Sequence, residues 1–570
     1  MQVGAQQQIR YATQPTYTVK SADLGPLGPL PLLDTPYSVT VIPQQLMVNQ
    51  QAQTVNQVLR NLPSVEIRDQ QGLQISRPQA RGFTGTVVQN TRLDGLNIIG
   101  TTAIPAENLG SIQVLNGLAG SLYGPETPAG VFNYVLKRPP DQWLLDYTQS
   151  LDSDSVLTGH LDLGGRAGAD DRIGYRLNLV HGEGQSFVSG SRVNRSLASG
   201  GFDYHFDDRT TLQTNVMHYA SDVTGLPGSI VYGSGSSTLL PQAIDPTRKG
   251  LLGQPGAGND LTTDTGLTKL THDFGNGWHF EIGGLDQVAI RNLLGITNQF
   301  TDNFGDFDVI KNFNAVSRYT IFSNLARLSG HFDLFGLHND VSFATNGFDN
   351  GSYNYRDSIA VPLGRAKISQ PVIFPVQPTP DNGGRYKSGE LRQQSLIAGD
   401  TLHFNPQWAV QGVLSDSLGS STSYAKNGAV TKSNNLNGVW NPTVSLIYTP
   451  DHALTLYSTY AHSTEVGDVA PAGTANANEF LAPFHDTQHE AGAKYAVSDN
   501  LLLTLAAFRM TRPLTSTNAA TNVFAVVGTQ RDDGVELFAQ GGITPQLSVL
   551  GGLTYIDARL LDTGAPMTDD

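Results

Sequence analysis

The stretch that decides the fold is IQVLNGLAGSLYGPETPAGVFNYVLKRP, residues 112–139. It holds two short β-rich runs around a segment rich in Gly and Pro, and the second run, residues 131–136, leads into Lys-Arg-Pro. Gly120, Gly124 and Gly130 supply the backbone freedom that tight turns need. A phosphate-binding loop would need GxxxxGK[ST] followed by a helical pattern, and the stretch shows neither. It therefore predicts a strand, a glycine-rich turn and a second strand of a small sheet.

The rest of the chain up to about Pro140 also changes pattern every few residues. Residues 54–62, TVNQVLRNL, predict a short helix because their apolar side chains recur at helical spacing. Short β-rich runs bounded by Gly, Pro, Asn or Asp follow this helix: SVEIRD, LQISRPQARGF, VVQNTRLDGLNI and IQVLNG. One short helix among several short strands predicts a compact α+β domain.

From about Trp143 onward the chain reads as a series of hairpins. Runs such as RIGYRLNLVHGEG (172–184) and LSVLGGLTYIDA (547–558) alternate in character as strands do. Some connections are tight, as in GADD and DDRT, whereas residues 221–264 and 349–388 form long polar connections. Short turns at one end and long loops at the other are typical of an outer-membrane β-barrel. About 17 strand candidates can be distinguished.

Composition and charge exclude several classes of protein. The formal net charge of −15, without any run of Lys and Arg, argues against a nucleic-acid partner. The absence of cysteine excludes disulfides, Cys-based zinc sites and thiol nucleophiles. No stretch reaches the roughly 18 apolar residues of a transmembrane helix. A soluble multi-sheet β protein is an alternative, although no repeat of fixed length supports a propeller.

Several motifs resemble those of TonB-dependent outer-membrane receptors, particularly the siderophore receptors. Residues 35–47 are similar to the first strand of the family's plug domain, residues 81–83 to its Arg-Gly-Phe, and residues 93–95 to its Leu-Asp-Gly turn. Residues 112–139 resemble the most recognisable plug segment. Between residues 440 and 544, the segments WNP, LTLYSTYAHS, PFHDTQHEAGAKY and QRDDGVELFAQGGIT resemble late barrel strands in the expected order.

The resemblance implies a mainly β fold, with a small α+β plug inside a large antiparallel transmembrane β-barrel. We expect an N-terminal extension over residues 1–34, a plug domain over 35–140 and a barrel over 141–570. Barrels of this family have about 22 strands, so about 17 candidates predict a C-terminally truncated barrel that lacks roughly five. The last strand, near residues 547–558, is then expected not to pair with the first, near 143–151.

The same resemblance implies a receptor and active transporter rather than an enzyme. Its ligand would be a ferric siderophore, moved inward when the TonB–ExbB–ExbD complex pulls on the plug, and no cofactor is expected. The expected location is the outer membrane of a Gram-negative cell, in contact with lipid and lipopolysaccharide. Uptake of cobalamin, a saccharide or another metal chelate is one alternative, and a non-transporting β-rich binding protein is another.

Three plug residues are candidate ligand contacts by their place in the resemblance. Arg81 and Glu107 would lie near the apex of the plug, with Ile99 on the neighbouring loop. For Arg81, a charge-assisted contact with an anionic ferric complex and an ion pair within the plug are both open interpretations. For Glu107 the alternative is a solvated loop carboxylate.

A short extended segment ahead of the plug, the TonB box, couples these receptors to their energy source. The nearest match in this chain is Thr16, Tyr17, Thr18 and Val19.

His485, His489 and Glu490 have the spacing of a helical metal site. On a strand, however, four residues span roughly 13 Å, too far for two side chains to share an ion. The resemblance places these residues on a strand, so no metal site is expected.

Overall fold

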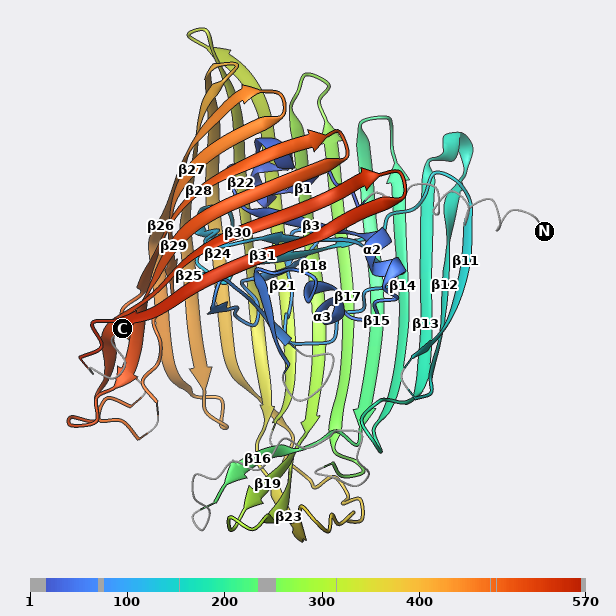
Figure 1. Ribbon diagram of the computed structural model, residues 1–570, viewed down its shortest axis with the longest axis vertical. Helices are drawn as coiled ribbons and strands as arrows, with labels where there is room; N and C mark the ends of the chain where they lie inside the picture. Colours follow the sequence, from blue (N-terminus) through green and yellow to red (C-terminus); the bar gives the residue numbers. More distant parts are fainter. Residues whose placement is uncertain are drawn as a thin grey trace.

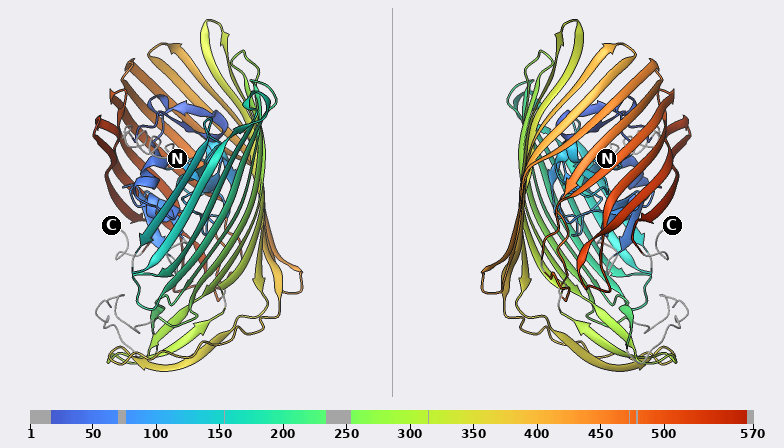
Figure 2. Two further views of the ribbon diagram at one scale, coloured as in Figure 1. Left: turned by 90° about the vertical axis from the view of Figure 1, so that its right-hand side faces the viewer. Right: turned by 90° about the vertical axis from the view of Figure 1, so that its left-hand side faces the viewer.

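The chain forms a small N-terminal body inside a large, curved antiparallel sheet. The computed structural model describes residues 17–69, 76–152, 154–233, 253–313, 315–471, 473–477 and 479–564. The N-terminal segments lie within the curve of the sheet in every view (Figures 1 and 2). The structure therefore confirms the predicted plug inside a barrel wall.

The inner body, which we call the plug, contains short strands and single-turn or two-turn helices. Its elements are β1 (Ser21–Asp23), η1 (Gly25–Leu27), β2 (Pro29–Pro31), η2 (Leu32–Asp34), β3 (Val39–Pro43), α2 (Gln44–Asn49), α3 (Val55–Leu59), β4 (Val65–Asp69), β5 (Ser76–Ala80), β6 (Phe83–Thr84), β7 (Thr91–Leu93), β8 (Leu96–Asn97), β9 (Leu109–Leu115), α4 (Gly120–Tyr123) and β10 (Val131–Leu136). The main sheet has the order β3-β9-β10-β7-β8, and β10 pairs with β7 in parallel. The strands β4-β5-β6 and β1-β2 form two smaller sheets.

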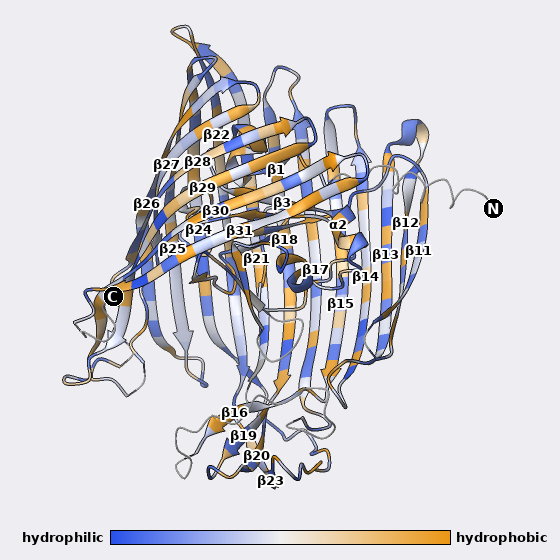
Figure 3. Cartoon of the chain, in the orientation of Figure 1, coloured by the Kyte–Doolittle hydropathy of each residue, from blue (hydrophilic) through white to orange (hydrophobic). Residues whose placement is uncertain are grey.

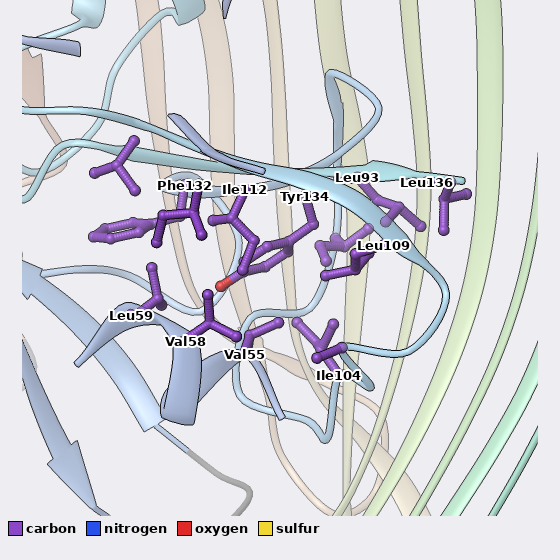
Figure 4. Close-up of a cluster of buried hydrophobic side chains, with 14 of the residues drawn as sticks. Val55, Val58, Leu59, Leu93, Ile104, Leu109, Ile112, Phe132, Tyr134 and Leu136 are labelled. Carbon is purple, nitrogen blue, oxygen red and sulfur yellow. The ribbon is translucent and has the colours of Figure 1, made fainter. Parts of the chain in front are cut away.

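The predicted helix at residues 54–62 is confirmed as α3. Thr54 and Gln57 form a capping box, in which each side chain bonds to the backbone of the other residue. The apolar face of α3 packs against the main plug sheet, where Val58 lies close to Phe132 and Tyr134 (Figure 4). Each such fully buried side chain contributes about 1.5–3 kcal/mol, so this cluster contributes substantially to plug stability.

The decisive stretch forms the two predicted strands, β9 and β10, with one addition. Between them, residues Gly120–Tyr123 form a helical turn, whose N–H groups at Leu122 and Tyr123 donate to the Ala119 carbonyl. Gly124 ends this turn at φ +84°, a conformation that favours glycine. The segment GSLY lacks β-branched residues, so nothing opposes one turn of helix.

The outer sheet has 17 strands in sequential order, which confirms the predicted number. They are β11 (Leu144–Asp152), β12 (Val156–Ala167), β13 (Ile173–Gln185), β14 (Arg192–His205), β15 (Thr210–Thr224), β17 (Gly258–Asp273), β18 (His279–Leu294), β21 (Ala315–Leu334), β22 (Leu337–Tyr355), β24 (Arg385–Asn405), β25 (Trp408–Tyr424), β26 (Val430–Asp451), β27 (Leu454–Glu465), β28 (Phe484–Ser498), β29 (Leu501–Thr517), β30 (Phe524–Thr544) and β31 (Leu547–Leu561). Tight turns, one of which contains η3 (Ala169–Asp171), join the strands at one end. Within the described residues, β11 and β31 form the two edges and do not pair with each other.

The barrel strands present polar side chains to the plug and less polar side chains outward. On β28, Asp486, Gln488 and Glu490 are buried, whereas His485 and His489, at alternate positions, are exposed. The same alternation is visible along many strands in Figure 3. It confirms that the two histidines lie on a strand.

The long connections at the other end contain strands of their own, which the sequence patterns did not predict. These are β16 (Ser229–Tyr232), β19 (Ile296–Phe300), β20 (Asp306–Asn312) and β23 (Ala360–Lys367), in the order β16-β19-β20-β23. This loop sheet, at the bottom of Figure 1, has its own core, in which Phe300 and Phe307 are buried. Among the described residues, no helix is long and apolar enough to cross a membrane.

Candidate functional site: the contacts between plug and barrel

Arg81 joins the plug to the barrel wall through two carboxylates. It lies in the turn between β5 and β6 at φ +54°, and its side chain is fully buried. The guanidinium donates to both carboxylate oxygens of Glu536, over 2.9 and 2.8 Å, and to Glu490 Oε2 over 2.6 Å. It also stacks 4.0 Å from the centre of the Phe508 ring. Arg81 therefore forms ion pairs, as one of the two interpretations expected, but its partners Glu490 and Glu536 lie on the barrel rather than in the plug.

Burial and charge act in opposite directions on Arg81. Burial would lower the pKa of its guanidinium, but the carboxylates of Glu536 and Glu490 raise this pKa overall. The guanidinium is therefore a permanent cation between two carboxylates, and removing it would leave buried charge unpaired. Because its side chain has no exposed surface, an external ligand has no access to it in this arrangement.

The turn that contains α4 packs closely against the wall. Ser415 Oγ donates to the Gly120 carbonyl over 2.8 Å, and the hydroxyls of Ser121 and Thr443 are also 2.8 Å apart. A Cβ atom on Gly120 would lie 2.4 Å from Ser463 Oγ and 3.1 Å from the Ser463 backbone. Gly120 is therefore required for the close contact with the wall, whereas its φ is not positive and the turn geometry does not demand glycine there.

The two other predicted ligand residues also lie against the wall. Ile99 is fully buried, and its backbone N–H donates to Gln287 Oε1 over 2.8 Å. Glu107 forms an ion pair with Arg195, with 2.6 Å between Oε1 and Nη1, and its side chain is only 10% exposed. The solvated-carboxylate interpretation of Glu107 is therefore wrong, because Arg195 on β14 draws it into the interface. Close by, the hydroxyls of Thr102 and Thr263 are 2.6 Å apart.

The segment before the plug lies near the tight-turn end of the barrel. Thr16 is outside the described residues, but Thr18 Oγ1 donates to the Asn500 carbonyl over 2.7 Å, in the turn between β28 and β29. Tyr17 accepts a hydrogen bond from Asn49. Residues 21–34, expected to be an extension, pack in the same apolar cluster as the plug and wall.

Lys494 on β28 anchors this segment by donating to the Leu32 carbonyl over 2.6 Å. On the opposite part of the wall, Arg327 on β21 donates to the Gly25 carbonyl over 2.5 Å. This segment is thus held both by polar contacts with the wall and by the apolar cluster that it shares with plug and wall. These wall residues were not predicted from the sequence. The polar side chains at every second position of β28 are a pattern that points to this inward face.

Within the described residues, no group of three or more His, Asp or Glu side chains could hold a metal ion. His485 and His489 point outward, whereas Glu490 of the same motif points inward to Arg81. The three residues of the motif therefore do not converge on one point.

A plug held inside a curved antiparallel sheet, with tight turns at one end and long loops at the other, defines the class of plugged β-barrel receptors. Residues 31–131 match the TonB-dependent receptor plug domain, and residues 200–569 match the TonB-dependent receptor-like β-barrel. The chain belongs to the TonB-dependent receptor family. Members of this family act as receptors and transporters rather than enzymes.

Relatives and solved structures agree with this assignment. The ferrichrome receptor FcuA of Yersinia enterocolitica is 25% identical over 98% of this chain and 75% of its own length. The catecholate siderophore receptor Fiu of Escherichia coli K12 is 24% identical over 96% and 78%. The crystal structure of BauA, the ferric preacinetobactin receptor of Acinetobacter baumannii, has a TM-score of 0.81 at 20% identity, over 96% of this chain and 82% of that one. This last likeness concerns the fold.

Proposed function

We propose that this protein is an outer-membrane receptor and active transporter for a ferric siderophore in a Gram-negative cell. The ferric complex is the cargo and binds at the loop end. In this proposal the protein uses no cofactor and catalyses no reaction. The TonB–ExbB–ExbD complex supplies the energy by pulling on the segment before the plug. The names of the relatives support this choice of cargo, since they include receptors for ferrichrome and for catecholate siderophores.

The observation that carries the proposal is the chemistry of the interface between plug and barrel. Hydrogen bonds and ion pairs hold the plug at Arg81, α4, Glu107 and Lys494, beside apolar clusters that also join plug and wall. Water can replace the polar contacts when the plug shifts, so a partly polar interface costs less to separate than a fully apolar interface of the same size. The interface thus suits a plug that stays in place at rest and moves under force.

The site residues have a revised role in this proposal. Arg81 and Glu107 hold the plug against β28, β30 and β14, and Ile99 fixes the neighbouring loop against β18. Contact between these side chains and the cargo would follow plug movement rather than precede it.

A different metal chelate is the second candidate cargo. It is favoured by one relative, the metal-pseudopaline receptor CntO of Pseudomonas aeruginosa, which is 24% identical over 79% of this chain and 63% of its own length.

The proposal is tested by cargo binding and uptake together. Tryptophan fluorescence should show saturable binding of ferrichrome or of a ferric catecholate, and uptake of radioactive iron should require TonB in cells that lack their own receptors. Binding should not require TonB. Saturable binding of a nickel or zinc chelate in place of both ferric complexes would favour the second candidate. TonB-independent uptake, or no binding of any chelate, would contradict the proposal.

A further inference from the structure

The plug meets the wall through two interfaces of different chemistry. Three apolar clusters and the polar contacts at Arg81 and α4 join the plug to strands between β17 and β31, and we call this the mixed interface. In one of these clusters, Phe83 and Leu118 of the plug pack with Phe508 of β29. The strands β11–β15, at the right of Figure 1, differ. Within the described residues they share one apolar cluster with the plug, and the plug supplies only Ala103 to it.

The contacts of the plug with β11–β15 are polar, and we call them the polar interface. They include two ion pairs, Glu107–Arg195 and Lys137–Asp162, and two hydrogen bonds, Gln53–Asp152 and Asn108–Ser199, with the plug residue named first. The charged atoms of the two ion pairs are 2.6 and 2.9 Å apart. All of these groups can also bind water.

A cavity of about 100 Å³ lies within the polar interface, between α2 with its neighbouring plug residues and the strands β11, β12 and β14. Every wall residue that lines it is polar or charged, including Thr158 and Asp162 of β12 and Arg195 of β14. Thr158 Oγ1 and Glu107 Oε2 are buried here and have no hydrogen-bond partner among the described residues. Buried polar groups rarely stay unbonded, and a polar cavity of this size holds several waters. The polar interface is therefore hydrated while the plug is in place.

This difference decides which interface separates at lower cost. Opening the polar interface replaces protein contacts with contacts to water that already reaches the gap, and both members of each ion pair become solvated together. Opening the mixed interface also exposes large apolar side chains, such as Phe508 and Met510, which are 5% and 0% exposed. A force on the plug therefore separates the polar interface first.

We propose that the plug separates first from β11–β15, and that the ferric complex passes through the gap between these strands and the plug while the mixed interface stays closed. Glu107 and Lys137 then line the passage on the plug side, and Asp162 and Arg195 line it on the wall side. The proposal rests on the proposed function for the identity of the cargo. The order in which the two interfaces open does not depend on any cargo.

The order of opening is tested with one cysteine at a time on the wall. Thr158→Cys lies in the polar interface and Ala461→Cys in the mixed interface, and the native side chains are matched in burial, at 3% and 2% exposed. The full chain, purified in detergent, is treated with fluorescein maleimide in urea too dilute to change its β-sheet circular dichroism. Since the chain has no native cysteine, labelling reports only these positions.

We expect Thr158→Cys to react about tenfold faster or more than Ala461→Cys, because exposing Ala461 requires the apolar cluster around Phe508 to open as well. Labelling after full unfolding, where both cysteines must react alike, is the control for intrinsic reactivity. Equal rates in dilute urea, or faster labelling of Ala461→Cys, would overturn the proposal.

The route of the cargo is tested by cross-linking each interface in cells with dibromobimane, which joins nearby cysteine pairs and fluoresces when both have reacted. Asn108→Cys with Ser199→Cys spans the polar interface, where the bonded side-chain atoms are 3.4 Å apart. Ser121→Cys with Thr443→Cys spans the mixed interface, where the hydroxyls are 2.8 Å apart. TonB-dependent uptake of a ferric complex should stop in the first pair and continue in the second.

Uptake through a cross-linked polar interface, or loss of uptake when only the mixed interface is cross-linked, would contradict the proposed route. If the chain takes up no ferric complex even without cross-links, the proposed function is wrong, while the labelling order still decides which interface opens first.

Discussion

At the scale of single residues, Arg81 is the cation on which two buried barrel carboxylates depend. Arg81→Ala would leave Glu490 and Glu536 without their partner, so we expect the plug to lose about 3–5 kcal/mol of stability within the barrel. A fluorophore on Val48→Cys reports plug unfolding in urea, because Val48 is 58% exposed and the chain has no other cysteine.

The control for this prediction adds Glu490→Gln and Glu536→Gln to Arg81→Ala. These changes remove the unpaired charges and should recover much of the lost stability. If the Arg81→Ala variant is as stable as the native protein but binds the ferric complex less tightly, Arg81 contacts the ligand directly and this prediction is wrong.

Glu126, in the loop after α4, makes plug stability depend on pH. It is 1% exposed, and burial raises its pKa to about 8 against a smaller lowering by Arg92. The folded state therefore holds an extra proton between the ordinary pKa of 4.5 and about 8, and the free energy of unfolding falls as pH rises through this window. Glu126→Gln should stabilise the plug at pH 8 and change little near pH 4.5.

The same urea assay at both pH values checks this prediction. Glu66→Gln, which alters an exposed plug carboxyl, should show no such pH-dependent gain. An equal effect of Glu126→Gln at both pH values would contradict the account.

Sequence reasoning located residues of the interface but not their partners. The Arg-Gly-Phe motif pointed to Arg81, yet its contacts Glu490 and Glu536 are more than 400 residues away in the chain. Pairings of this kind depend on the three-dimensional path of the sheet, which local patterns do not contain.

At the scale of elements, the loop sheet is stabilised by its own aromatic core. Phe307 is 3% exposed, and its ring centre is 5.6 Å from that of Phe300. Phe307→Ala should cost about 3–5 kcal/mol of local stability. Proteolysis of the loops should then become faster, while the barrel strands stay protected.

Phe304→Ala is the matched control, since Phe304 lies on the same hairpin and is 83% exposed. It should leave proteolysis unchanged. Equal cleavage of both variants would show that this core does not hold the loops together.

The elements differed in how well the sequence predicted them. Helix α3 follows local periodicity because it buries one apolar face, and β10 was predicted as a short apolar run after a glycine-rich turn, although both of its faces are buried. The loop sheet was missed because three separate connections supply its strands, and β16 pairs in parallel with β19. Pairing across distant loops leaves no periodic signal in any one of them.

At the scale of the whole molecule, strand alternation and the contrast between short turns and long loops predicted a barrel wall, and the family resemblance predicted the plug inside it. The inward positions Asp486, Gln488 and Glu490 of β28 are polar and buried because they face the plug. This alternation does not indicate which polar contacts must break during transport.

The proposed function requires the plug to move relative to the wall for cargo to pass. Thr102→Cys with Thr263→Cys places a cysteine pair between plug loop and β17, where the native hydroxyls are 2.6 Å apart. Thr487→Cys with Thr511→Cys, whose hydroxyls are 2.7 Å apart, joins β28 to β29 and leaves the plug free. The chain has no native cysteine to interfere.

The deciding measurement is TonB-dependent uptake of the bound ferric complex by cells that carry each pair, under oxidising and then reducing conditions. We predict that the oxidised plug-to-wall pair binds the complex but does not transport it, that reduction restores transport, and that the wall-to-wall pair transports in both states. Undiminished uptake by cells whose plug is verifiably cross-linked to β17 would contradict the account.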